Sequence, residues 1–198
     1  MKVFTIKNSI LQSCSYILSS SESDNVYIVD CGDVQKIFDF LENEKKQPVA
    51  VLLTHGHYDH IYGLKDLLCR YPNTIVIASS ETINALYNVD LNKSFMFEID
   101  QDYTINSDTV NTYTVKHNSE LMIFDKKLKC ILTPGHDVGC MTYLVDGCIF
   151  TGDAYILGVP VFTKWSTSNF EEAQNSVKTI KLLIEQMHLT LYSGHYLG

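Results

Sequence analysis

The apolar residues of this chain gather in short runs that alternate with amphipathic segments. Residues 49–53 (VAVLL) form a continuous apolar run, which is typical of a strand covered on both faces. Residues 26–30 and 74–78 have the same character and predict two further strands. Apolar side chains at spacings of three and four predict two amphipathic helices. Asp33 stands directly before the first of them and can cap it. Their apolar faces comprise Val34, Ile37, Phe38 and Leu41, and then Leu64, Leu67 and Leu68.

The second half of the chain is richer in strands. Residues 109–116, 121–124, 128–133 and 189–192 have strand composition. Asp146 and Gly147 lie between the apolar runs MTYLV and CIFT, a pattern typical of a two-residue hairpin with a type I′ turn.

A last helix is predicted between these strands. Ser168 and Glu171 form a capping-box pattern ahead of an apolar stripe at residues 170, 173, 177, 180 and 184. Strands and helices interleave without a linker or a fixed repeat, so we expect one domain, residues 1–198, of the α/β or mixed α+β class.

The composition describes an ordinary soluble globule. Of 198 residues, 45% are hydrophobic and 19% are charged, and no run of about 18 apolar residues predicts a membrane-spanning helix. The formal net charge of −8 repels phosphate backbones and anionic membranes at long range. We therefore expect a small-molecule substrate, with neither nucleic acid nor a membrane as partner. The sequence carries no indication of the oligomeric state.

The six cysteines are sparse for a chain of this length, and no secretory segment is visible. This favours free thiols in a reducing compartment over a disulfide framework. We expect a cytoplasmic protein.

Candidate chemistry concentrates in residues 54–60, directly after the apolar run. This stretch reads THGHYDH and holds four metal-capable side chains, His55, His57, Asp59 and His60. Imidazole and carboxylate are ligands for zinc, iron and manganese. In an extended segment His55 and His57 point to the same side, and a turn after Tyr58 brings the other two to the opposite flank of one cavity. The pattern predicts one loop that serves two adjacent metal ions.

Three later turns each add one ligand-type residue directly after a glycine. They are His136 in TPGH, Asp153 in TGD and His195 in SGH, each following a predicted strand. Strand-end loops gather at one edge of a sheet scaffold, where sites are commonly built. A lone Gly-His or Gly-Asp is usually only a turn, so the joint presence of all three with residues 54–60 indicates the site. The alternative interpretation is an accidental histidine cluster that scavenges metal weakly.

These motifs resemble those of the metallo-β-lactamase superfamily. THGHYDH is similar to its His-x-His-x-Asp-His motif, and TPGH, FTGD and SGH are similar to its three downstream ligand motifs, in the same order. The likeness extends over nearly the whole chain, from VYIVDCG to the final SGH. It implies a four-layer αβ/βα sandwich with metal ions at one edge of the paired sheets.

The resemblance also implies a role for each metal-capable residue. His55, His57 and His136 would hold one divalent metal ion, Asp59, His60 and His195 would hold a second, and Asp153 would bridge the two. Zinc is the expected metal, with iron or manganese as alternatives. Asp59 and Asp153 are the candidate catalytic residues. Asp30 lies at the end of a predicted strand and matches a position that supports the metal-binding loop, residues 54–60, through hydrogen bonds. These residues are called the metal loop below.

Within the superfamily, the motifs are most similar to the glyoxalase II-like branch. Zinc β-lactamases usually carry Cys where this chain has Asp153, and they lack this arrangement of His60. The sequence ends soon after His195, without the helical extension of glyoxalase II, and residues 158–168 lack a basic, glycine-rich stretch. Both departures move the expected substrate away from a glutathione thioester. Asp137 stands where Thr or Ser is usual, which leaves no hydroxyl there to support a ligand.

We therefore predict a hydrolase in which a hydroxide shared by two metal ions attacks a small ester, thioester or lactone. No side-chain nucleophile is needed, so Cys140 and Cys148 are interpreted as core residues. Three aromatic residues that follow Asp153 either wall a substrate pocket or pack in the core: Phe162, Trp165 and Tyr155. Tyr58 and Tyr196 flank ligands and are candidates to hydrogen-bond a bound oxyanion.

Other functions also fit the sequence. An iron persulfide dioxygenase would use one metal ion, held chiefly by His55, His136 and Asp153, and TPGHDVGC around Cys140 is similar to that group. A metal-binding or sensing module without turnover is the alternative from another class. Nucleic-acid processing is disfavoured by the acidic charge. Metal analysis separates the dioxygenase from the hydrolase, because the dioxygenase would bind one iron and the hydrolase two metal ions.

Overall fold

The computed structural model describes residues 1–97 and 102–196. Its first sheet has the strand order β1-β2-β3-β4-β5-β6, antiparallel from β1 to β3 and parallel from β3 to β6. The strands are β1 (Lys2–Lys7), β2 (Cys14–Ser19), β3 (Asn25–Val29), β4 (Gln47–Leu52), β5 (Ile75–Ala78) and β6 (Asn111–Thr114).

The second sheet has the strand order β11-β10-β9-β8-β7. Strands β7 to β10 pair antiparallel, and β11 joins β10 in parallel. The strands are β7 (Glu120–Ile123), β8 (Lys126–Leu132), β9 (Met141–Val145), β10 (Cys148–Gly152) and β11 (Thr190–Ser193).

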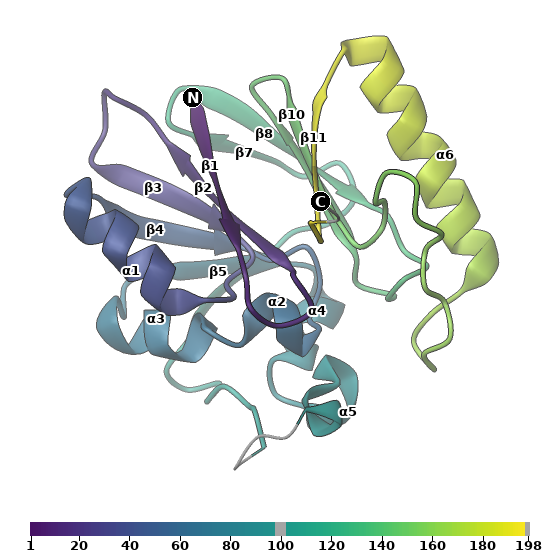
Figure 1. The fold of residues 1–198 in the computed structure, drawn as a ribbon, viewed down its shortest axis with the longest axis horizontal. Helices are drawn as coiled ribbons and strands as arrows, with labels where there is room; N and C mark the ends of the chain where they lie inside the picture. The colour runs from purple at the N-terminus through teal and green to yellow at the C-terminus, as the bar shows by residue number, and fades with distance from the viewer. Residues whose placement is uncertain (98–101, 197–198) are drawn as a thin grey trace.

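Helices cover the outer faces of the two sheets, with α1 and α3 on one side and α6 on the other (Figure 1). The helices are α1 (Val34–Asn43), α2 (Tyr58–Ile61), α3 (Leu64–Arg70), α4 (Ser80–Ala85), α5 (Val89–Asn92) and α6 (Phe170–Met187), with a short 3-10 helix, η1 (Ser94–Met96). In the described part of the chain, no helix has both the length and the apolar character needed to cross a bilayer.

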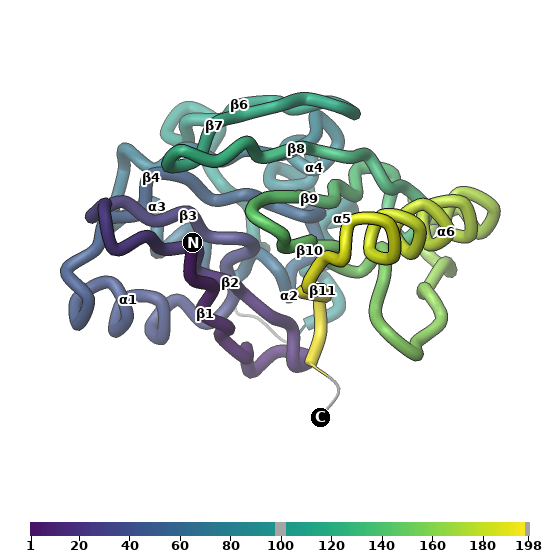
Figure 2. The backbone as a smooth tube through the Cα atoms, turned by 90° about the horizontal axis from the view of Figure 1, so that it is seen from above, coloured from purple at the N-terminus to yellow at the C-terminus, as the bar shows by residue number. Residues whose placement is uncertain are grey.

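The core is divided by the sheets into three apolar clusters. Successive side chains of a strand point to opposite faces, so Leu18 of β2 packs between the sheets with Tyr143 and Phe150. Its neighbour Ile17 instead faces the cluster shared with α1 and α3. The third cluster lies between the second sheet and α6, where Ile180 packs. These layers, seen along another axis in Figure 2, confirm the predicted four-layer αβ/βα sandwich.

Local predictions met mixed outcomes. The hairpin between β9 and β10 is confirmed, with φ of 50° at Asp146 and 77° at Gly147 and with pairing across the turn. The capping box at Ser168 is wrong by one residue, because Asn169 caps α6 by accepting the amide of Glu172 at 3.1 Å. The same spacing recurs one residue along, and the hydroxyl of Ser168 donates instead to the carbonyl of His136 at 2.6 Å.

Two features of the fold were not predicted: the contacts of the Asp33 side chain and the first two strands. Helix α1 begins directly after Asp33, as expected, but the Asp33 side chain makes no capping bond. Its carboxylate accepts hydrogen bonds from Ser9 and Tyr62 and pairs with Lys36 at 2.6 Å. Strands β1 and β2 were not predicted, although β2 is buried along its whole length.

Candidate metal centre

The metal-capable residues lie where strands end at one edge of the sandwich. Strand β4 ends at Leu52, an extended segment carries His55 and His57, and α2 then begins at Tyr58. The turn of α2 places Asp59 and His60 beside the extended pair, as predicted. The turns after β8, β10 and β11 supply the other three residues.

Glycine before the ligand position has a packing reason in all three of these turns, as Gly194 and Gly135 show. A Cβ on Gly194 would lie 2.0 Å from Oδ1 of Asp153, so only glycine lets the end of β11 pass this carboxylate. Gly135 has a φ of 130°, and a Cβ there would lie 2.2 Å from the backbone nitrogen of Ala173. The repeated strand–glycine–ligand pattern thus reflects close packing around the site.

The structure brings all seven predicted residues together. Within each of three groups, one ligand atom per residue lies within 4.8 Å of the others. The groups are His55, His57 and His136; His55, His60 and Asp153; and Asp59, His60 and His195.

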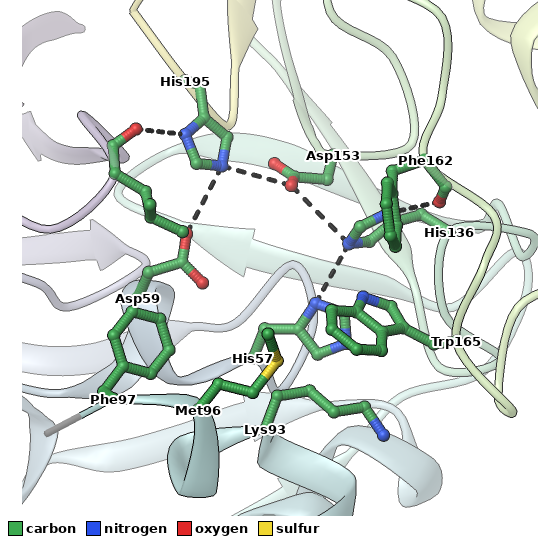
Figure 3. A pocket seen from close by; sticks show the side chains of 11 residues that line it. His57, Asp59, Lys93, Met96, Phe97, His136, Asp153, Phe162, Trp165 and His195 are labelled. Atoms are coloured by element: carbon green, nitrogen blue, oxygen red, sulfur yellow. Dashed lines mark hydrogen bonds and ion pairs between the residues drawn. The ribbon is translucent and has the colours of Figure 1, made fainter.

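Asp153 lies between His195 and His136 in Figure 3, that is, between the residues proposed for the second metal ion and those proposed for the first. Its Oδ2 is 3.6 Å from Nε2 of His136 and 3.2 Å from Nε2 of His195. Its Oδ1 is 3.4 Å from Nε2 of His60. This carboxylate therefore contacts both sets, which is the position that a bridging ligand requires.

Hydrogen-bond acceptors on the outer side of the imidazole rings of His60, His136 and His195 fix which ring nitrogen faces the cluster. Nδ1 lies 2.9 Å from an acceptor in three rings: Oδ2 of Asp30 for His60, the carbonyl of Phe162 for His136 and the carbonyl of Leu11 for His195. Since these oxygens only accept, Nδ1 of each ring carries a proton, and Nε2 is the nitrogen that faces the cluster.

Asp30 also acts on His55 through Thr54. The Thr54 hydroxyl donates to Oδ2 of Asp30 at 2.8 Å and lies 3.1 Å from Nδ1 of His55, whose proton it can accept. The support role predicted for Asp30 is thus present as hydrogen bonds to the metal loop.

His57 is turned the other way. Its Nδ1 faces Nε2 of His136 at 3.0 Å, and its Nε2 lies 3.7 Å from Oδ2 of Asp137. The residue that replaces the usual Thr or Ser therefore sets a carboxylate, held by the amide of Gly139 at 3.0 Å, beside this ring.

The donor set fits bound cations. Nε2 of His55 and Oδ1 of Asp153 are buried without a hydrogen-bond partner in the described residues, whereas buried polar atoms are normally paired. Nδ1 of His57 and Nε2 of His136 face each other at 3.0 Å. With the proton of His136 on Nδ1, its Nε2 offers a lone pair, and Nε2 of His57 is also buried without a hydrogen-bond partner in the described residues.

Burial and charge shift the pKa values of the clustered residues in both directions. Burial, reinforced by neighbouring histidine charge, holds the pKa of His55 well below its ordinary value. Burial alone would raise the pKa of Asp153, but the charge of His60 and hydrogen bonds from His195 and His60 hold it well below its ordinary value. Burial alone would lower the pKa of His60 and of His195, but the carboxylates of Asp59 and Asp153 raise both. Ionised carboxylates thus draw positive charge into the place where a metal ion would supply it.

Comparison with known proteins identifies the family. The model of the metallo-beta-lactamase superfamily matches residues 10–195. The chain belongs to this superfamily. A probable polyketide biosynthesis zinc-dependent hydrolase, PksB of Bacillus subtilis, is 30% identical over 184 residues, covering 92% of this chain and 72% of that protein.

A second relative of this superfamily member is much longer. The hydroxyacylglutathione hydrolase of Citrobacter koseri is 27% identical over 143 residues, covering 72% of this chain but only 47% of the relative. The chain thus matches about half of that protein.

Solved structures confirm the fold of the superfamily. The B3 metallo-beta-lactamase BLEG-1 superposes with a TM-score of 0.85 at 22% identity, covering 99% of this chain and 92% of the other. TTHA1623 in a di-iron-bound form gives a TM-score of 0.79 at 20% identity, covering 98% and 93%.

A pocket of about 240 Å³ opens onto the candidate metal centre (Figure 3). Five of the seven predicted residues line it: His57, Asp59, His136, Asp153 and His195. The rest of the wall is Leu11, Lys93, Met96, Phe97, Phe162 and Trp165. Phe162 and Trp165 were candidates from the sequence. The other four were missed, because they lie far from the motifs along the chain and carry no signal of their own.

The remaining candidates lie elsewhere. Tyr155 is buried in the cluster beneath α6, Tyr58 packs against Phe97 and Tyr103, and the ring of Tyr196 lies 3.0 Å from the ammonium of Lys7. Cys140 is buried in the core, as predicted, and burial raises the pKa of its thiol well above the ordinary value.

Proposed function

We propose that this superfamily member is a hydrolase that uses two divalent metal ions to cleave a small ester, thioester or lactone. The observation that carries the proposal is the complete double set of ligand atoms, with the Asp153 carboxylate between the two halves. His55, His57 and His136 would hold one ion, and Asp59, His60 and His195 the other. Zinc is the first choice, since PksB is described as zinc-dependent; iron is the alternative, because TTHA1623 binds two irons.

The residues of the chain would organise the reaction around this centre. When bound, the two ions would activate a water molecule at neutral pH and polarise the substrate carbonyl. Asp59 and Asp153 line the pocket, where their carboxylates can orient the attacking water by accepting its hydrogen bonds. Phe162 and Trp165 would place the substrate and exclude bulk water. Asp30 and Thr54 would keep the imidazoles of His60 and His55 in the metal-binding tautomer.

The central test joins metal content to activity. The zinc-loaded protein should contain about two ions per chain and should hydrolyse at least one substrate in a panel of small esters, thioesters and lactones. Asp153→Ala should lose metal and activity together. Asp125→Ala is the matched control, because the Asp125 side chain is 77% exposed and outside the pocket.

Three outcomes would contradict the proposal. An unchanged hydrolysis rate in Asp153→Ala would show that the proposed bridge is not needed. A metal-loaded protein that hydrolyses nothing in the panel would favour a binding or sensing module. One tightly bound iron per chain, with oxygen consumed on a persulfide substrate, would instead favour the dioxygenase alternative.

A further inference from the structure

One cation lines the pocket among apolar side chains. Lys93 follows α5 in the left-handed conformation, with φ of 62°. The residue is 6% exposed. Its ammonium donates to the carbonyl of Asp90 at 2.5 Å and lies 5.6 Å from the ring centroid of Trp165. Apart from Lys93 and the candidate ligands, the pocket wall formed by the described residues is apolar.

Among the residues that the structure describes, this ammonium has no ion-pair partner, although its burial calls for one. Burying a charge is costly unless it is paired, and a lysine ammonium has three hydrogens to donate. The Asp90 carbonyl takes one of them, and no carboxylate of residues 1–97 and 102–196 forms an ion pair with Lys93. Lys93 lines the pocket, and an anion bound there would supply a counter-charge.

We propose that Lys93 binds an anionic group of the substrate, so that the preferred substrate is a small ester, thioester or lactone that carries a carboxylate and an apolar segment. The inference rests on the proposed hydrolase function. In Figure 3, Lys93 lies below His57 and Trp165, whereas Asp153 and His195 lie in the upper part of the view. The reacting carbonyl would lie at the metal centre and the carboxylate at Lys93, with the apolar segment against Trp165.

The experiment compares matched substrates that differ only in charge. The acyl side is tested with the mono-para-nitrophenyl ester of glutaric acid against para-nitrophenyl valerate, in which a methyl group replaces the carboxylate. The leaving-group side is tested with the butyryl thioesters of β-mercaptopropionate and of propanethiol. Values of kcat/KM are measured for the zinc-loaded wild type, Lys93→Met and Lys93→Arg. Lys93→Met keeps the apolar stem, and Lys93→Arg keeps the charge.

Lys164→Met is the matched control. Lys164 is exposed in the same loop as Trp165 and does not line the pocket. A purely long-range effect of charge would act in both lysine-to-methionine variants, whereas direct binding would act only at Lys93.

In one of the two substrate pairs, we expect the wild type to prefer the member that carries the carboxylate. Lys93→Met should lower kcat/KM for that substrate by at least about tenfold, as for loss of a charge-assisted hydrogen bond. The neutral partner should change by less than about twofold, and Lys93→Arg should restore most of the preference. A role limited to packing on Trp165 would lower both members equally. Equal losses for both members, or an equal loss in Lys164→Met, would overturn the proposal.

A binding measurement decides the question even if no substrate is hydrolysed. Trp165 is the single tryptophan of the chain, so its fluorescence reports on the pocket. Titration with butyrate and with butyramide should show that Lys93→Met weakens binding of the anion and not of the amide. Butyrate that binds only at the metal centre would bind both proteins equally, and that outcome would refute the role of Lys93. Failure of hydrolysis with intact, Lys93-dependent anion binding would count against the proposed function alone.

Discussion

Asp30 accepts three hydrogen bonds beneath the candidate metal centre. The Thr54 amide and hydroxyl donate to it at 2.8 Å each, and Nδ1 of His60 lies 2.9 Å from its Oδ2. Asp30→Asn preserves the size of the side chain, and asparagine tolerates the left-handed φ of 55° found here. The new amide can still accept the Thr54 amide proton, but its NH₂ group would face the Nδ1 proton of His60.

Two facing donors force a change in His60. Its proton would move to Nε2, the atom that faces Asp59, Asp153 and His195, and the lone pair offered to the second metal ion would be lost. Removing such an orienting partner lowers metal affinity by about ten- to a hundredfold, which corresponds to about 1.4–2.7 kcal/mol. The first ion should be affected less, since among its three ligands only His55 depends on Asp30, through Thr54, whereas His57 and His136 have other partners.

The assay is a zinc titration in competition with a chromophoric chelator. Wild type should bind two equivalents, and Asp30→Asn should keep one strong site and weaken the other by the stated factor. Asp24→Asn, at an exposed position before β3, is the matched control. Two sites of wild-type affinity in Asp30→Asn would refute the argument that Asp30 sets the tautomer of His60.

Three further predictions concern folding and reactivity. Gly135→Ala should lower the free energy of unfolding in urea by at least about 2 kcal/mol, because φ is 130° and the new Cβ would strike the backbone of α6; an unchanged midpoint would contradict the packing argument. Iodoacetamide followed by peptide mass spectrometry should label exposed Cys69 and spare buried Cys140 in the folded protein, and equal labelling of the two would count against the fold. Burial alone would raise the pKa of Asp33, but an ion pair with Lys36 and accepted hydrogen bonds lower it from 3.8 to about 2. The stability from this carboxylate is therefore present above 3.8 and lost as pH falls through about 2, so the Tm deficit of Asp33→Asn should shrink as the buffer is acidified; a constant deficit would refute it.

The candidate site was predictable because its residues are tied to local patterns. His55, His57, Asp59 and His60 lie within six positions directly after an apolar run, and one short segment cannot place them far apart. His136, Asp153 and His195 follow glycines at strand ends, where turn geometry restricts the chain. The resemblance to a known family then assigned roles that a single pattern could not.

Some local patterns were misleading or silent. The capping spacing occurs twice, at Ser168 and at Asn169, and only the packing of the preceding turn decides between them: Ser168 is engaged by the carbonyl of His136. Strand β1 has mostly exposed or half-buried residues, so its apolar positions give no clear period of two. Its pairing with β2 is what defines it.

By itself, the sequence determined the class of fold, the strand-end placement of the ligands and the identity of all seven metal-capable residues, because each depends on side-chain chemistry and on neighbours near in the chain. Only the tertiary structure decided which side chains share the pocket. Leu11 comes from the β1–β2 connection, Lys93 and Phe97 from the segment around η1, and Trp165 from the loop before α6. Their meeting depends on how the two sheets pack, which buries apolar surface without regard to separation along the chain.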